Sequence, residues 1–181
     1  HDIRAYDHTG ALQWTTPGVT ACETYPLITD LTGDGTVEIV VNQLVLDGAT
    51  GALRFTLPIA GDANWGAPAA ADLDQDGTQE ILLENRVYSA TGAFLWACGK
   101  GGSGSFPQPV NIDGDAMGEL LVAGYGQMTL CDHDGTELWQ RTYYSYGPTL
   151  AKQIHGNAFA RAAVRGALSP IARVADVISP I

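Results

Sequence analysis

The chain has 181 residues, of which 16% are charged, and its formal net charge is −11. This length fits one domain or a short array of repeats that can bury a core. A chain this acidic repels nucleic acid and anionic membranes, and no apolar stretch approaches the roughly 20 residues that cross a bilayer, so we expect neither nucleic-acid binding nor membrane insertion.

The first 16 residues predict two strands joined by a tight turn at Thr9-Gly10. An aromatic residue, Trp14, follows this turn. The same pattern recurs three times, with the glycine always four residues before the aromatic: Thr50-Gly51 to Phe55, Thr91-Gly92 to Trp96, and Asp134-Gly135 to Trp139. Glycine tolerates the positive φ of a hairpin turn. Because the recurrence is regular, we expect the four aromatic residues to pack between neighbouring repeats.

An acidic segment followed by an apolar run also occurs three times. The acidic segments are 30–38, 72–80 and 111–119, and the apolar runs after them are 39–41, 81–83 and 120–122. Such runs predict buried strands. Each repeat is therefore expected to consist of an acidic loop, two strands, a glycine turn and a further strand.

The second acidic segment has the most complete set of calcium ligands. Asp72, Asp74 and Asp76 converge on one point when the loop curls, the carbonyl of Thr78 can add an oxygen, and Glu80 closes the shell. The first segment offers Asp30, Thr32, Asp34, Thr36 and Glu38, and the third offers Asn111, Asp113, Asp115, Met117 and Glu119. These two sets carry fewer charges, so we expect them to bind Ca²⁺ more weakly.

An EF-hand begins with the same spacing but requires a carboxylate at its twelfth position and helices on both sides. The twelfth positions of the three segments are Val41, Leu83 and Val122, and the flanking residues have strand character. The sequence therefore argues against an EF-hand.

Residues 143–181 are more basic and richer in alanine than the rest of the chain. The segment 153–164 nevertheless follows the pattern of 111–122, with Arg161 at the position of the glutamate. We interpret this region as a fourth repeat that has lost its acids and binds no calcium, and a C-terminal helix or unrelated tail is the alternative.

The acidic segments resemble the FG-GAP and VCBS repeats of integrin α-like propellers, in which an aromatic-Gly and Pro segment precedes the acidic loop. Here Trp65-Gly-Ala-Pro68 and Tyr146-Gly-Pro148 occupy that place. The resemblance implies an all-β chain of about four β-propeller blades, each an antiparallel four-stranded sheet with calcium in its loop. The expected units are 1–16 as a partial blade, 17–57, 58–98 and 99–142 as blades, and 143–181 as a degenerate blade or tail.

Four blades are fewer than the seven usual in that family. The ring can close within one chain, be completed by a second chain, or stay open as a stacked array. Because an open ring exposes strand edges, we expect a homo-oligomer or a polymer.

The expected function is that of a secreted or cell-surface calcium-binding module with a structural, adhesive or self-assembly role, for which a protein or a glycan is the candidate ligand. Loop affinities typical of extracellular modules would leave the sites empty in a calcium-poor cytosol. The alternatives are a lectin-like propeller and a propeller of the polysaccharide lyase type. We expect no catalytic residue, because His8 and His133 lie in glycine turns. Cys22, Cys98 and Cys131 allow at most one internal disulfide, whose pairing the sequence leaves open.

Overall fold

The computed structural model describes residues 2–19, 25–59, 67–99, 105–113, 115–124 and 126–142. These residues form 14 strands, so the prediction of an all-β chain is confirmed for them. Within the same ranges, no helix has the length and apolarity that a membrane span requires. The predicted fourth repeat at 143–181, Cys22 and Trp65 lie outside the described residues.

The strands form four antiparallel sheets, none of which closes on itself, and the strands of each sheet follow chain order. A hairpin pairs β1 (Ile3–Tyr6) with β2 (Leu12–Thr16). The first four-stranded sheet consists of β3 (Leu27–Thr29), β4 (Glu38–Val41), β5 (Leu44–Asp47) and β6 (Leu53–Thr56). The second consists of β7 (Ala69–Ala71), β8 (Glu80–Leu83), β9 (Arg86–Tyr88) and β10 (Phe94–Ala97). The third consists of β11 (Phe106–Val110), β12 (Glu119–Gly124), β13 (Gln127–Cys131) and β14 (Glu137–Thr142).

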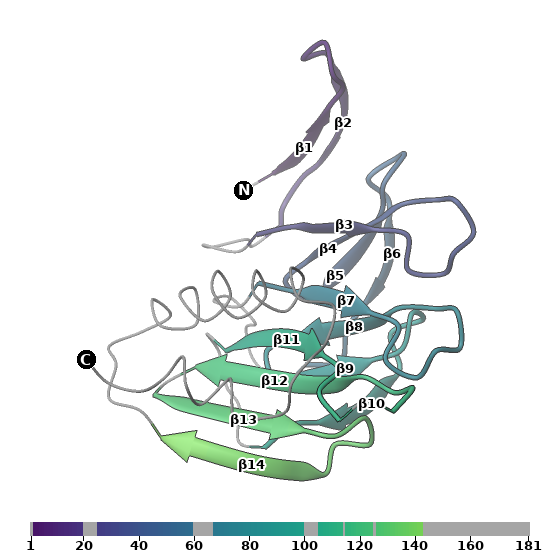
Figure 1. Ribbon diagram of the computed structural model, residues 1–181. Coiled ribbons are helices and arrows are strands. Elements are labelled where there is room, and N and C mark those ends of the chain that lie inside the picture. Colours follow the sequence, from purple (N-terminus) through teal and green to yellow (C-terminus); the bar gives the residue numbers. More distant parts are fainter. Residues whose placement is uncertain are drawn as a thin grey trace.

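The sheets follow one another through space in the order of the chain (Figure 1). The first strand of the second sheet, β7, contacts both β3 and β11, which are the first strands of its two neighbours. The acidic loops leave these first strands on the same side of the molecule (Figure 1). Corresponding parts of the repeats therefore lie next to one another.

The second strand of each four-stranded sheet is buried on both faces, which explains its continuous apolar sequence. In β4, Val40 packs with residues of the second sheet, whereas Ile39 and Val41 pack towards the β1–β2 hairpin. In β8, Ile81 faces the first sheet and Leu82 faces the third. Alternate side chains of one strand thus contribute to two different cores.

The glycine turns bring neighbouring sheets into close contact. Each turn glycine has a positive φ, from 72° to 87°. In three cases an aromatic ring of the preceding sheet lies against the glycine, at the place where a Cβ atom would be: Trp14 against Gly51, Phe55 against Gly92, and Trp96 against Gly135. The prediction that these aromatics pack between repeats is confirmed for the three pairs. Trp139 packs on the core of the third sheet.

A disulfide joins Cys98, which follows β10, to Cys131 at the end of β13. Both cysteines are buried in the core that the second and third sheets share. Two neighbouring sheets are therefore linked covalently.

Candidate metal centre

The three acidic loops connect the first strand of each sheet to the second, and each is anchored by its second residue. Leu31 and Leu73 are 0% and 3% exposed and belong to the cores between sheets. A buried glutamate at the start of the next strand accepts the backbone N–H of this second residue: Leu31 to Glu38 at 2.9 Å, Leu73 to Glu80 at 2.8 Å, and Ile112 to Glu119 at 2.6 Å.

The loops are also bonded to the next sheet. The backbone N–H of Gln79 donates to the carbonyl of Leu31 at 2.7 Å, and that of Gly118 donates to the carbonyl of Leu73 at 2.7 Å. Gln79 additionally donates its side-chain amide to the carbonyl of Asp30 at 3.0 Å. The conformation of one acidic loop is therefore coupled to the packing of the sheet that follows.

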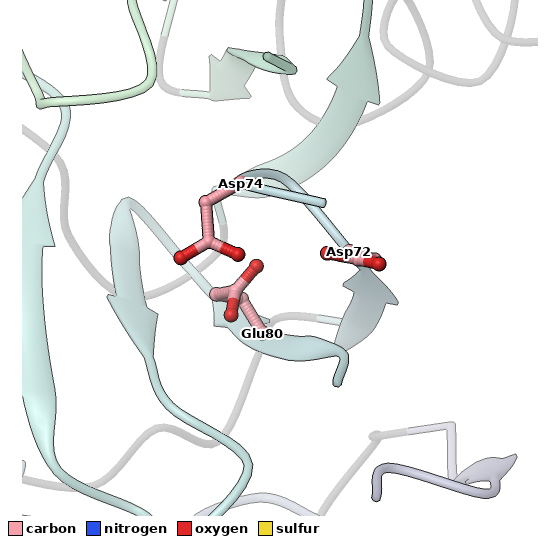
Figure 2. A group of neighbouring side chains, drawn as sticks. All are labelled: Asp72, Asp74 and Glu80. Atoms are coloured by element: carbon pink, nitrogen blue, oxygen red, sulfur yellow. The ribbon is translucent and has the colours of Figure 1, made fainter. Parts of the chain in front are cut away.

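The second loop gathers three carboxylates. Oxygens of Asp72, Asp74 and Glu80 lie within 4.8 Å of one another, and Figure 2 shows them around a common space. Asp72 also holds the loop closed, because it accepts the N–H groups of Asp76 and Gly77 at 3.0 Å. Three negative charges at this distance repel one another unless a cation or a proton intervenes.

The structure does not bring Asp76 into this cluster. Its carboxylate accepts the backbone N–H and the hydroxyl of Thr78 at 2.8 and 2.7 Å, and these bonds hold the pKa of Asp76 below its ordinary value. Glu80 shows the opposite shift. Burial raises the pKa of Glu80, and the charges of Asp74, Asp76 and Asp72 raise it further against the lowering effect of the Leu73 amide.

The first loop has a different arrangement. Asp30 accepts the N–H groups of Gly33 and Gly35 at 2.8 Å, and Asp34 accepts both the N–H and the hydroxyl of Thr36. Thr32 is half-buried. Although the whole loop is described, its acids do not form a group of three metal-ligating side chains.

The buried glutamate of the first loop, Glu38, forms an ion pair with a basic side chain of the same protein, Arg54. Arg54 Nη1 lies 2.5 Å from Oε1 of Glu38, and Arg54 Nη2 lies 3.1 Å from Oδ2 of Asp47. Glu38 is 1% exposed, so its charge needs such a partner. The bond to Asp47 raises the pKa of Arg54, and Glu38 adds to this effect.

The third loop gathers only part of its predicted ligands. Asp113 and Glu119 have oxygens within 4.8 Å of each other, and the third member of the group is Asp132, from the glycine turn of the same sheet. The side-chain amide of Asn111 donates to the carbonyls of Asp115 and Met117 at 2.9 and 3.0 Å. The side-chain amide of Asn111 therefore bridges the centre of the third loop.

Sequence reasoning missed Asp132 as a neighbour of the acidic loop and Arg54 as the partner of Glu38. A signal for Asp132 was present, since Asp7, Asp47 and Asp132 recur just before the glycine turns. In the first sheet this position ends the strand that pairs with the glutamate strand, as the register Glu38 to Asp47 shows, and in the third sheet Asp132 comes directly after that strand.

The donor sets of the second and third clusters fit a hard divalent cation. Each consists of carboxylate oxygens only, with two exposed or half-buried acids and one buried glutamate. Ca²⁺ and Mg²⁺ prefer such oxygen ligands, whereas Zn²⁺ and copper favour nitrogen or sulfur. In the third cluster, Oε1 of Glu119 is buried and has no hydrogen-bond partner among the residues that the structure describes, as expected of an oxygen that a cation would contact.

No protein-family model and no curated protein matches this chain. Similar solved structures include the biofilm matrix protein Bap1 of V. cholerae, with 24% identity and a TM-score of 0.62 over 78% of this chain and 24% of that one. The exotype rhamnogalacturonan lyase YesX has 20% identity and a TM-score of 0.46 over 66% of this chain and 24% of that one. Rhamnogalacturonan lyase PL11 of Bacillus licheniformis has 16% identity and a TM-score of 0.43 over 78% and 44%.

The chain thus spans about a quarter of the length of Bap1. At this identity the likeness to Bap1 shows a common fold of β-sheets. The two lyases are too distant to bear on the activity of this chain.

Proposed function

We propose that this chain is a calcium-stabilised β-propeller segment of the FG-GAP or VCBS type, secreted, without catalytic activity, and with a structural or adhesive role. The observation that carries the proposal is the position of the acidic loops. The first two loops place their second residues, Leu31 and Leu73, in the cores between sheets. All three loops are followed by a buried glutamate that lies beside other carboxylates or a cation.

In this proposal each four-stranded sheet is one blade. Three features support it: the strands of each sheet follow chain order, the first strands of neighbouring sheets touch, and the second strands are buried on both faces. The proposed units are 17–57, 58–98 and 99–142 as blades, 1–16 as two strands of a further blade, and 143–181 as a degenerate one.

Calcium would act by relieving repulsion at the contact between blades. The carboxylates of Asp72, Asp74 and Glu80 oppose folding while all three are ionised and close together. Because the carbonyl of Leu73 in the same loop is bonded to Gly118 of the next sheet, a cation that fixes the loop also fixes this contact. The expected effect of Ca²⁺ is therefore on stability.

The disulfide between Cys98 and Cys131 supports a location outside the cytosol, because such bonds form and persist in oxidising compartments. Extracellular calcium would also suffice for loops of modest affinity. Bap1, which shares the fold, is a biofilm matrix protein, and this fits a structural role outside the cell.

The proposal is tested by thermal unfolding of the 181-residue chain in calcium and in chelator. We expect calcium to raise the Tm of the wild type, and Asp74→Asn to lose much of this increase because it removes one of three charged ligands. The matched control is Asp2→Asn, which removes an exposed carboxylate that pairs with Arg4 at 3.4 Å. An identical Tm in calcium and in chelator would contradict the proposal.

Assembly through exposed strand edges belongs to the same proposal. The outer strands β6 and β10 are largely exposed, and an unpaired edge can accept a strand of another copy. Light scattering over a range of protein concentrations would then show a mass that increases with concentration. A constant monomer mass would remove assembly from the proposed function.

A further inference from the structure

The three buried glutamates allow an internal comparison. Glu38, Glu80 and Glu119 are 1%, 5% and 0% exposed, and each uses Oε2 to accept the N–H of the second loop residue. One oxygen of each carboxylate therefore needs a further partner. What occupies that position differs between the sheets.

In the first sheet the partner is an arginine held by a neighbouring aspartate. Asp47 lies directly opposite Glu38 in the β4–β5 register. Arg54 lies at a bulge, since Val45 pairs with Phe55 while Leu46 pairs with Leu53. From this position its guanidinium contacts both carboxylates. Two carboxylates therefore share one guanidinium.

The third sheet repeats the two acids but not the arginine. Leu120 pairs with Cys131, so Asp132 continues the register opposite Glu119. The residue at the equivalent bulge is Leu138, between Glu137 and Trp139, and it is 43% exposed. A leucine cannot neutralise a carboxylate. The charge of the buried glutamate is left without a basic partner from this position.

The remaining contacts of Asp132 and Glu119 leave room for a ligand. Oδ1 of Asp132 accepts the backbone N–H of His133 at 2.7 Å and also lies 2.7 Å from Nδ1 of the same residue. Oε1 of Glu119 is buried, and no atom of the described part of the chain forms a hydrogen bond with it. Oxygens of Asp113, Glu119 and Asp132 lie within 4.8 Å of one another.

We propose that Asp113, Glu119 and Asp132 bind a divalent cation at the corner that the Arg54 guanidinium fills in the first sheet. Three carboxylates and no nitrogen or sulfur select a hard cation, Ca²⁺ or Mg²⁺. This site shares Asp113 and Glu119 with the set that the sequence predicted and adds Asp132. Asn111 is not a member, because its amide bonds the carbonyls of Asp115 and Met117. It rests on the premise of the proposed function that the acidic loops bind cations.

The test measures binding of Ca²⁺ by calorimetry in the Asp74→Asn background, where the cluster of the second loop has lost a ligand. We expect one site to remain and Asp132→Asn to weaken it by about tenfold or more. The matched control is Asp134→Asn, which removes an exposed carboxylate of the same turn that lies outside the cluster. Unchanged affinity in Asp132→Asn would overturn the inference.

A second variant places an arginine at position 138, the equivalent of Arg54 in the first sheet. Leu138→Arg should abolish binding at this site and raise the Tm of the cation-free protein, because the guanidinium replaces the cation. Leu138→Gln is the uncharged control and should keep the site. If Leu138→Arg binds Ca²⁺ as the wild type does, the inference is wrong while the second-loop site can still bind. If the wild type binds no Ca²⁺ at all, both proposals fail.

Discussion

The turn glycines differ in what surrounds them, although their backbones are alike. Gly51 has a φ of 72° and lies directly against the ring of Trp14, whereas Gly10 has a φ of 83° and no atom within 4 Å of an added Cβ. A side chain at either position strains the backbone, but only at Gly51 does it also displace a ring between sheets.

We therefore expect Gly10→Ala to lower the free energy of unfolding by about 1 kcal/mol, the cost of positive φ. Gly51→Ala should cost about 1–3 kcal/mol more, because overpacking adds to the strain. Urea denaturation of both variants gives the comparison. Equal losses would show that the ring moves aside without cost.

At Glu80 the pKa is raised by burial and by nearby carboxylates, so its charged form opposes folding when no cation is bound. Stability linked to Glu80 is then present below its unfolded pKa of about 4.3 and is lost as the pH rises through the higher folded pKa. Glu80→Gln removes this dependence.

In calcium-free buffer, the free energy of unfolding of Glu80→Gln relative to wild type should thus increase between pH 4 and pH 7. In saturating calcium at pH 7 the wild type should have the higher free energy of unfolding, because the variant has lost a ligand. Urea unfolding at both pH values measures the first effect, with Asp2→Asn as a control that shows little pH-dependent difference. A pH-independent difference would exclude the neighbouring charges as the cause.

At the scale of elements, the acidic loop and the next sheet fit together through a glycine. A Cβ added at Gly118 would lie 2.9 Å from Cδ2 of Leu73, whose backbone carbonyl accepts the N–H of Gly118. The absence of a side chain at 118 thus permits both the apolar contact and the hydrogen bond.

This contact predicts a coupling between the two residues. Leu73→Ala should cost about 2–5 kcal/mol as a cavity in the core, and Gly118→Ala about 1–3 kcal/mol as overpacking. In the Leu73→Ala background, Gly118→Ala should cost at least about 1 kcal/mol less, because the clashing methyl group is gone. The control background is Leu31→Ala, where the cost of Gly118→Ala should stay the same. Additive costs in both backgrounds would refute the coupling.

The repeated elements were predictable from the sequence because their signals are local. The apolar runs after the acidic loops predicted the strands β4, β8 and β12. The turns at Gly51 and Gly92 also lie where the sequence predicted them. The turns between the second and third strands were not predicted. There Asn42 and Glu84 adopt φ values of 52° and 58°, a conformation that glycine would have signalled more clearly.

The candidate site was less predictable than the sheets. Spacing along a loop indicates which carboxylates can approach, and Asp72, Asp74 and Glu80 do. It does not indicate contacts across a hairpin, such as that of Arg54 with Glu38, because these depend on register and on a bulge. Sites that combine two segments are therefore the ones that a single-segment motif misses.

At the scale of the whole molecule, the disulfide adds a cross-link between the second and third sheets, which already follow each other along the chain. It closes a loop with a sequence separation of 33 residues. Closing a loop of this length restricts the unfolded chain and stabilises the folded state by about 3–4 kcal/mol.

We expect the double variant Cys98→Ala, Cys131→Ala to lose a free energy of unfolding of about this size. Wild-type protein in reducing agent should lose a similar amount, and the variant should not respond to the reductant. Urea unfolding with and without reductant makes the comparison. A variant as stable as the oxidised wild type would show that the bond contributes no net stability.

The contact of an aromatic ring with the turn glycine of the following sheet gives the chain a direction. The first and second four-stranded sheets each present a ring, Phe55 or Trp96, to the sheet after them and receive one, Trp14 or Phe55, from the sheet before them. A duplicated stretch of gene that encodes one period would therefore insert a sheet already complementary to both neighbours. Such an architecture can be lengthened or shortened by recombination without any new interface having to evolve.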